Sequence, residues 1–266
     1  MQDLHDKVAL VTGAARGIGR ASAARLAQDG AAVMLVDRDE RALEVAASEL
    51  RSDGVDVAAA AVDVTVASTV DELMERTVAS LGGLDVLVNC AGIQRYGTVV
   101  DTSEELWDEV MAVNVRSGFL MSRGAIPLMR ARGGGSIVNV SSAQAVAAQQ
   151  NAAAYVASKG AVNALTRAMA VDHAAECIRV NAVCPASVDT PMLRWAAGHL
   201  ANGDGAEQLL RDWGAMHPIG RVGAPAEVAE LIAFLAGPRA AFITGADYRV
   251  DGGLLAALGV ATGGAA

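Results

Sequence analysis

The sequence predicts an α/β fold, a doubly wound parallel β-sheet flanked by helices on both faces. Short runs rich in Val, Leu and Ile alternate along the chain with longer Ala-rich segments of helical periodicity. Several of the short runs are apolar without polar alternation, as expected for strands that are covered on both faces. The repeated order of strand and helix indicates parallel strands joined by right-handed crossovers.

The elements follow in chain order. Segments 8–12, 31–37, 55–64, 84–92, 135–142, 178–185 and 247–253 are predicted strands. Segments 17–29, 39–53, 67–81, 103–131, 153–175 and 225–237 are predicted helices, in which Ala contributes high helix propensity. We expect a single domain over residues 1–266, because no repeat and no Pro/Ser-rich linker divides the chain.

Segment 190–223 interrupts this alternation and is rich in Gly and polar residues. A long insertion before the last helix of such a sheet favours a lid over the ligand crevice. The alternative is a partly disordered surface loop.

An acidic composition excludes some partners. The chain carries a formal net charge of −9 and has a pI near 4.9, so nucleic acid and anionic membranes would repel it. The uncharged stretch 133–158 carries Ser, Asn and Gln throughout, which a membrane span would not tolerate. We expect no nucleic-acid partner and no membrane partner.

The three cysteines form no C-x-x-C pair, and the four histidines show no metal-ligand spacing. We therefore expect free thiols and no metal site. The N-terminal segment "MQDLHDKVALVTG" lacks the apolar middle of an export leader, so we expect a cytoplasmic protein.

A glycine-rich turn, "VTGAARGIGRA" at 11–21, links the first predicted strand to the first predicted helix. Gly13, Gly17 and Gly19 permit a tight turn and let backbone N–H groups approach a pyrophosphate, while the helix N-terminus adds partial positive charge. This context makes the predicted fold Rossmann-like and predicts a dinucleotide cofactor.

Asp37 ends the second predicted strand, where a carboxylate reaches the hydroxyls of an adenosine ribose and repels a 2′-phosphate. This position favours NAD. Arg16 in the glycine loop and Arg38 leave NADPH open as the alternative.

Other strand ends supply further cofactor candidates. Asp63 could accept a hydrogen bond from the adenine amino group, next to the backbone of Val64. Asn89 closes the fourth predicted strand, where it would contact the cofactor or tie adjacent loops together.

Tyr155 and Lys159 lie one helical turn apart in "YVASK", beside the uncharged stretch. Residues spaced by four share a helix face, so the two side chains should meet at one site. A nearby ammonium favours the phenolate, and we expect it to lower the pKa of the Tyr155 phenol toward the range of a useful acid or base.

Motifs in this order resemble the short-chain dehydrogenases/reductases. They include "TGAARGIG", "DV" at 63–64, "NCAG" at 89–92, "MAVNVRSG", "IVNVSS" at 137–142, "YVASK" at 155–159, "IRVNAVCPASVDTPM" at 178–192, "PIGRVGAPAEVAELIAFLA" at 218–236 and "ITGADYRVDGG" at 243–253. The resemblance covers about Asp6 to Leu254, nearly the whole chain.

The resemblance implies a role for several residues. It implies a catalytic set of Asn114, Ser142, Tyr155 and Lys159, contacts of Val188 and Thr190 with the nicotinamide carboxamide, and a backbone contact of Ile18 with the pyrophosphate. It also implies a homotetramer or homodimer formed through the helices at 103–131 and 153–175.

This chain departs from the family pattern at three positions. Cys90 replaces the second Asn of the commoner "NNAG", and Ser117 stands where Gly is usual. Ala186 follows Pro185 where Gly is preferred, and a Cβ there would be strained if the backbone needed positive φ.

The substrate wall is expected from the segments 93–96, 143–151 and 190–216. These offer Gln94, Arg95, Gln144, Gln149, Asn151, Met192 and Trp195. The amides and the guanidinium suit a sugar, a sugar lactone or a polyol, whereas the Ala, Val, Met and Trp side chains suit a cyclic or apolar alcohol.

We expect an NAD-dependent dehydrogenase acting on the secondary alcohol of a small molecule. The alternatives are an NADPH-dependent reductase of ketones or 3-oxoacyl thioesters, and a non-catalytic dinucleotide-binding protein.

Overall fold

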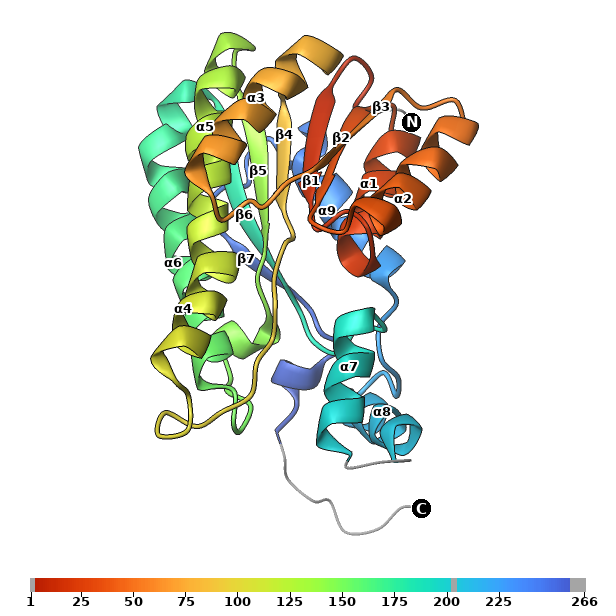
Figure 1. The fold of residues 1–266 in the computed structure, drawn as a ribbon, viewed down its shortest axis with the longest axis vertical. Helices are drawn as coiled ribbons and strands as arrows, with labels where there is room; N and C mark the ends of the chain where they lie inside the picture. The colour runs from red at the N-terminus through yellow and green to blue at the C-terminus, as the bar shows by residue number, and fades with distance from the viewer. Residues whose placement is uncertain (1–2, 202–204, 259–266) are drawn as a thin grey trace.

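A computed structural model describes residues 3–201 and 205–258. Its centre is a parallel sheet of seven strands in the order β3-β2-β1-β4-β5-β6-β7 (Figure 1). The strands are β1 (Val8–Thr12), β2 (Ala32–Asp37), β3 (Val57–Ala61), β4 (Val86–Asn89), β5 (Gly135–Val140), β6 (Ile178–Pro185) and β7 (Asp247–Val250). The predicted Rossmann-like α/β fold is confirmed.

Helices cover both faces of the sheet, and each face has its own core. On one face α1 (Gly17–Gln28), α2 (Glu40–Ser52) and α9 (Pro225–Ala236) pack together with side chains such as Val11 and Leu35. On the other face α3 (Ala67–Leu81), α5 (Ser117–Ala131) and α6 (Ala153–His173) pack with Leu10 and Leu87. Because successive strand residues point to opposite faces, apolar strands fill both cores.

The predicted continuous helix over 103–131 is wrong. The segment forms α4 (Glu104–Met111), a π-helical turn η1 (Ala112–Arg116) and then α5. Its hydrophobic pattern continues across the break, so the sequence predicted a single helix.

Two helices form within the segment 190–223, α7 (Pro191–Leu200) and α8 (Ala206–Ala215). They lie beyond the end of the sheet, away from the helices that cover its faces (Figure 1). Thr190 begins α7 as its N-cap, and its hydroxyl oxygen accepts a hydrogen bond from the Leu193 N–H at 3.2 Å.

The strand order reverses between β1 and β4, and ligands bind at such a switch point in doubly wound sheets. Thr12 at the end of β1 joins the two strands there, because its hydroxyl oxygen accepts hydrogen bonds from the N–H groups of Cys90 and Ala91, both at 3.0 Å. The backbone at the switch point is therefore fixed before any ligand binds.

Candidate active site

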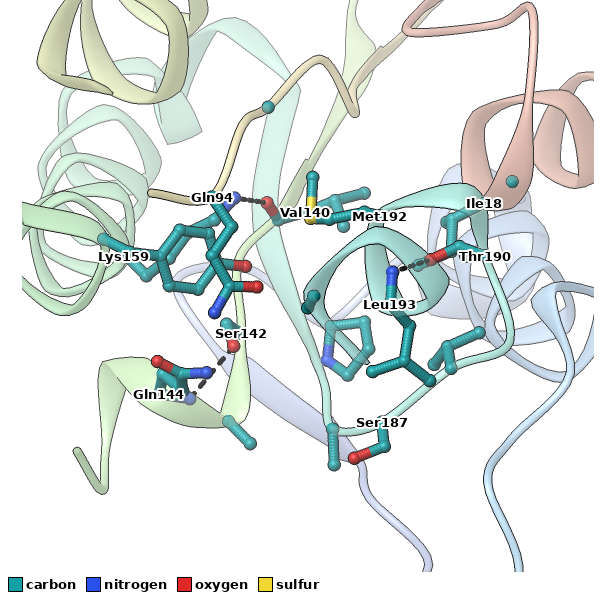
Figure 2. Close-up of a pocket in the computed structure, with 18 of the residues that line it drawn as sticks. Ile18, Gln94, Val140, Ser142, Gln144, Lys159, Ser187, Thr190, Met192 and Leu193 are labelled. Atoms are coloured by element: carbon teal, nitrogen blue, oxygen red, sulfur yellow. Dashed lines mark hydrogen bonds between the residues drawn. The ribbon is translucent and has the colours of Figure 1, made fainter. Parts of the chain in front are cut away.

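A cavity of about 630 Å³ lies at this switch point, between the glycine turn, the ends of β4, β5 and β6, and the two helices α7 and α8 (Figure 2). It brings together most of the residues predicted from the sequence. These are Gly13, Arg16, Gly17, Ile18, Gly19, Asp37, Gln94, Ser142, Gln144, Gln149, Tyr155, Lys159, Val188, Thr190 and Met192.

At one end of the cavity, the glycine turn leads into the N-terminus of α1. Gly13 has a φ of +66°, and a Cβ built on it would lie 3.1 Å from the Ala91 backbone. A Cβ on Gly19 would lie 2.1 Å from the carbonyl oxygen of Gly13, so only glycine fits. This shape, with a helix N-terminus behind it, fits the pyrophosphate of a dinucleotide.

Asp37 lies at the end of β2 beside the glycine turn. Its two carboxylate oxygens accept hydrogen bonds from the N–H groups of Ala15 and Asp39, both at 3.1 Å. These bonds hold the carboxylate at the cavity wall, where it faces any group bound beside the glycine turn.

Arg16 and Arg38, the two arginines that keep NADPH possible as the alternative cofactor, both have acidic neighbours. The guanidinium of Arg16 forms an ion pair with Asp39. Hydrogen bonds from Thr65 lower the pKa of the Asp63 carboxyl, and the charge of Arg38 lowers it further, which places Arg38 near this second carboxylate.

Tyr155 and Lys159 meet on one face of α6, as their spacing predicted. Both are buried, and the Lys159 Nζ lies 5.6 Å from the centre of the Tyr155 ring. The same Nζ donates a hydrogen bond of 2.9 Å to the carbonyl oxygen of Val140 at the end of β5.

The lowered pKa that the spacing of Tyr155 and Lys159 predicted for the phenol is not found. Burial raises the pKa of the Tyr155 phenol to about 12, although a hydrogen bond from Ser142 opposes the rise. Burial also lowers the pKa of Lys159 to about 8. Desolvation disfavours each charged form, and it is the largest cause of both shifts.

Ser142 lies two residues after the end of β5 and lines the cavity beside Gln144 (Figure 2). Its hydroxyl oxygen accepts the backbone N–H of Gln144 at 3.0 Å, and the hydroxyl is also a hydrogen-bond neighbour of the Tyr155 phenol.

Asn114 lies in the π-helical turn and outside the cavity lining. Its amide bonds to both backbone groups of Ile93, accepting at 2.8 Å and donating at 2.9 Å, and it also donates to the Ser158 hydroxyl at 3.0 Å. A Cβ built on Gly92 would lie 3.4 Å from the Asn114 Oδ1 and 3.6 Å from the Lys159 Nζ. Asn114 and Lys159 therefore approach the same side of Gly92.

Three cofactor candidates also lie outside the cavity lining. Asp63 accepts hydrogen bonds from the Thr65 hydroxyl and N–H, and Val64 is buried in the core. Asn89 donates to Asn139 of β5 at 2.9 Å and to Ser122 of α5 at 3.3 Å, so it ties β4 to a strand and a helix and not to an adjacent loop.

Three residues that were expected to contact the substrate also lie outside the cavity lining. Arg95 forms an ion pair with Glu109 of α4. Asn151 is exposed, with a φ of 57°, and its carbonyl oxygen accepts the Gly97 N–H at 2.7 Å. Trp195 is 46% exposed and stacks with Tyr96 and His199.

Several lining residues were not singled out from the sequence. Tyr96, Leu193, Ala196, Trp213 and Met216 lie in the segments expected to form the substrate wall, whereas Cys90, His217, Leu254 and Leu255 lie outside those segments. His217 is buried, its Nδ1 lies 2.7 Å from the Trp213 carbonyl oxygen, and its Nε2 accepts the Ser187 N–H at 3.4 Å. It occurs in no motif that would single it out, so only the fold places it beside the β6 loop.

The departures from the family pattern are accommodated. Ala186 is not among the described residues with positive φ, so its Cβ introduces no strain there. The hydroxyl of Ser117 is buried against its own helix and donates to the Val113 carbonyl oxygen at 2.6 Å. Burial raises the pKa of the Cys90 thiol to about 12, which keeps it protonated.

Within residues 3–201 and 205–258, no group of three or more His, Cys, Asp or Glu side chains is placed to hold a metal ion. None of their helices has both the length and the apolar character that a bilayer span requires.

Comparison with known proteins gives the family. The family profile described as "Enoyl-(Acyl carrier protein) reductase" matches residues 13–255. The cis-4-hydroxycyclohexanecarboxylate dehydrogenase of Sinomonas cyclohexanicum is 42% identical over 252 residues, which cover 94% of this chain and 97% of the relative.

Two solved structures are similar over almost their whole length. The ligand-free aldohexose dehydrogenase of Thermoplasma acidophilum is 40% identical with a TM-score of 0.89, covering 98% of each chain. The L-sorbose reductase of Gluconobacter frateurii, solved with NADPH and L-sorbose, is 35% identical with a TM-score of 0.92, covering 97% of this chain and 99% of that one. The chain therefore belongs to the short-chain dehydrogenase/reductase family, whose members are oxidoreductases that bind a nicotinamide dinucleotide.

Proposed function

We propose that this chain is an NAD(H)-dependent oxidoreductase that interconverts a secondary alcohol and the corresponding ketone or lactone. The observation that carries the proposal is that Ser142, Tyr155 and Lys159 line the same cavity as the glycine turn and Asp37. One cavity thus offers a cofactor site and an acid/base site within reach of each other.

The cofactor would lie along the cavity from the glycine turn to the end of β6. Gly13, Gly17, Ile18 and Gly19 would hold the pyrophosphate by backbone N–H groups, with Asp37 on the adenosine ribose. Val188 and Thr190 would meet the carboxamide, and Lys159 the second ribose. When bound, the nicotinamide supplies the hydride acceptor of the oxidation and the hydride donor of the reverse reaction.

The preference for NAD follows from charge. The Asp37 carboxylate would repel a 2′-phosphate, and of the two arginines that could offset this repulsion, Arg16 forms an ion pair with Asp39 and the charge of Arg38 also acts on Asp63. NADPH would meet an excess of negative charge at this end of the cavity.

Each catalytic side chain has a separate task. Tyr155 would take the proton of the alcohol in the oxidation and return it in the reduction. Ser142 would donate a hydrogen bond to the same substrate oxygen, where negative charge develops. Lys159 would favour the phenolate, and Asn114, which also borders Gly92, would hold a water that relays protons to solvent.

Initial rates with NAD and NADP, measured by absorbance of the reduced cofactor over a panel of sugars, polyols, cyclic alcohols and ketones, test the proposal. We expect turnover with NAD to exceed turnover with NADP. Asp37→Ser should lower the ratio of turnover with NAD to turnover with NADP about tenfold or more. The reason is that like charges placed side by side, here the Asp37 carboxylate and the 2′-phosphate, cost several kcal/mol. Tyr155→Phe should lower kcat about 10²–10⁴-fold, the usual contribution of a general acid/base.

Cofactor binding, followed by fluorescence of the reduced cofactor, is the control for Tyr155→Phe and should remain close to wild type. A strong preference of the wild type for NADP would refute the NAD assignment. Unchanged turnover in Tyr155→Phe would refute the acid/base assignment. If the wild type turned over no combination of cofactor and substrate, a non-catalytic protein would be favoured.

A further inference from the structure

Amide side chains form a connected wall on one side of the cavity. The Gln144 Nε2 donates to the Gln149 Oε1 at 2.7 Å, and the Gln94 Nε2 donates to the same oxygen at 3.4 Å and to the Tyr96 hydroxyl at 3.1 Å. All four residues line the cavity. We call Gln94, Tyr96, Gln144 and Gln149 the amide wall.

One acceptor in this wall lacks a partner among the described residues. The Gln144 Oε1 is buried and receives no hydrogen bond. Reversing this amide alone would place the Gln144 oxygen against the Gln149 oxygen. A buried acceptor left without a donor costs about 1–3 kcal/mol, so this oxygen favours a ligand that carries an O–H or N–H group.

The amide wall begins beside the proposed reaction centre. Gln144 follows Ser142 by two residues, and its backbone N–H donates to the Ser142 hydroxyl oxygen at 3.0 Å. Figure 2 shows Gln94, Ser142 and Gln144 along one side of the cavity and Met192 and Leu193 of α7 along the other. The cavity therefore has one polar and one apolar wall.

We propose that the amide wall binds a second hydroxyl group of the substrate, so that the enzyme prefers diols and polyols to simple alcohols. The second hydroxyl donates to the Gln144 Oε1 once the amide turns this buried oxygen toward the cavity, while the first hydroxyl is held by Ser142 and Tyr155. This inference rests on the proposed function, because it takes the oxidised alcohol to lie at Ser142 and Tyr155.

Matched pairs of substrates test the inference. Cyclohexanol is compared with the cis and trans 1,2-diols, cyclopentanol with its 1,2-diols, and hexoses with their monodeoxy analogues, at saturating NAD. For the wild type we expect kcat/KM to favour the hydroxylated partner of at least one pair about tenfold or more, as sites built for a hydroxyl reject analogues that lack it.

Gln144→Met removes the acceptor and keeps a side chain of similar length, and it should collapse that preference to about twofold or less. Gln150→Met is the matched control, because Gln150 is exposed and lies outside the cavity lining. It should retain the wild-type preference.

Binding measurements separate this inference from the proposed function. Calorimetric titration of the NAD-loaded Tyr155→Phe protein with each pair reports recognition without turnover. A diol preference in binding that Gln144→Met abolishes supports the inference even if no alcohol is oxidised, an outcome that would refute only the proposed function. Equal kcat/KM and equal binding constants within every pair of substrates, or a diol preference that survives Gln144→Met, would overturn the inference. Either result would indicate that water satisfies the Gln144 oxygen.

Discussion

Burial disfavours the charged forms of both Tyr155 and Lys159. The phenol has a pKa of about 12 and the amine a pKa of about 8. Below about pH 8 the resting pair is ammonium with phenol, and the form active in oxidation, ammonium with phenolate, carries one proton fewer. Above about pH 8 the resting pair is amine with phenol, which carries the same number of protons as the active form.

This count of protons predicts the pH profile of alcohol oxidation. We expect log kcat/KM to rise with pH at a slope of about one and to level off near pH 8, where Lys159 loses its proton. Steady-state rates across a constant-ionic-strength buffer series measure the profile.

Lys159→Met provides the comparison. Without the amine, the phenol alone titrates, so activity should be lower and its rise should continue past pH 8 toward the pKa of Tyr155 near 12. A wild-type profile that rises without levelling off would contradict the assignment of this pair.

Aromatic rings attach helix α7 to the loop that follows β4. Tyr96, Trp195 and His199 stack on one another, with ring centres 5.3–6.1 Å apart. Tyr96 also accepts a hydrogen bond from Gln94 in the amide wall, so the stack connects the position of α7 to the substrate side of the cavity.

Trp195→Ala should therefore weaken substrate binding more than cofactor binding. An aromatic pair contributes about 0.5–1.5 kcal/mol, so we expect the substrate KM to rise about twofold to tenfold. The exposed Trp195 adds little to the core, and the melting temperature should change by less than about 2 °C.

Leu200→Ala removes an exposed apolar side chain from the end of the same helix and serves as the control. Its KM values should stay near wild type. Equal effects of the two variants, or a larger change for the cofactor than for the substrate in Trp195→Ala, would exclude a role of the stack in substrate binding.

The strands, the glycine turn and the Tyr155–Lys159 pair could be predicted because each depends on local pattern. The order of the strands in the sheet and the set of residues that line the cavity could not be predicted, because they depend on packing between segments that are distant in the sequence. Trp195 and Trp213 both lie in segment 190–223, yet Trp213 faces the cavity while Trp195 stacks with Tyr96. The periodicity of the sequence does not distinguish the two tryptophans. Trp195 lies in α7, which contacts the loop after β4 through Tyr96, whereas Trp213 lies in α8.

At the scale of the whole molecule, α4, α5 and α6 form a layer on one face of the sheet (Figure 1). Large apolar side chains remain exposed on it, among them Trp107 at 40%, Phe119 at 47% and Val171 at 79%. Exposed apolar side chains of this size favour contact between subunits. We propose that this face carries the subunit interface of a homotetramer or homodimer.

Light scattering during size exclusion should accordingly give two or four times the chain mass of 27.1 kDa. Phe119→Glu should shift the protein to a smaller species, because a carboxylate buried in an apolar interface lacks a partner. Val45→Glu, at an exposed position on α2, is the control and should leave the mass unchanged. A wild-type monomer, or a Phe119→Glu protein of unaltered mass, would exclude this interface.

The π-helical turn has a consequence for how this region tolerates insertions and deletions. A π turn holds one residue more than the α-helical path would need. The surplus lies between α4 and α5, which pack against different neighbours, α6 and α3. Shortening Ala112–Arg116 by one residue would allow an uninterrupted α-helix, and it would rotate Asn114 away from Ile93 by about 100°. The one additional residue of the π turn thus determines the direction in which the Asn114 amide points beside Gly92.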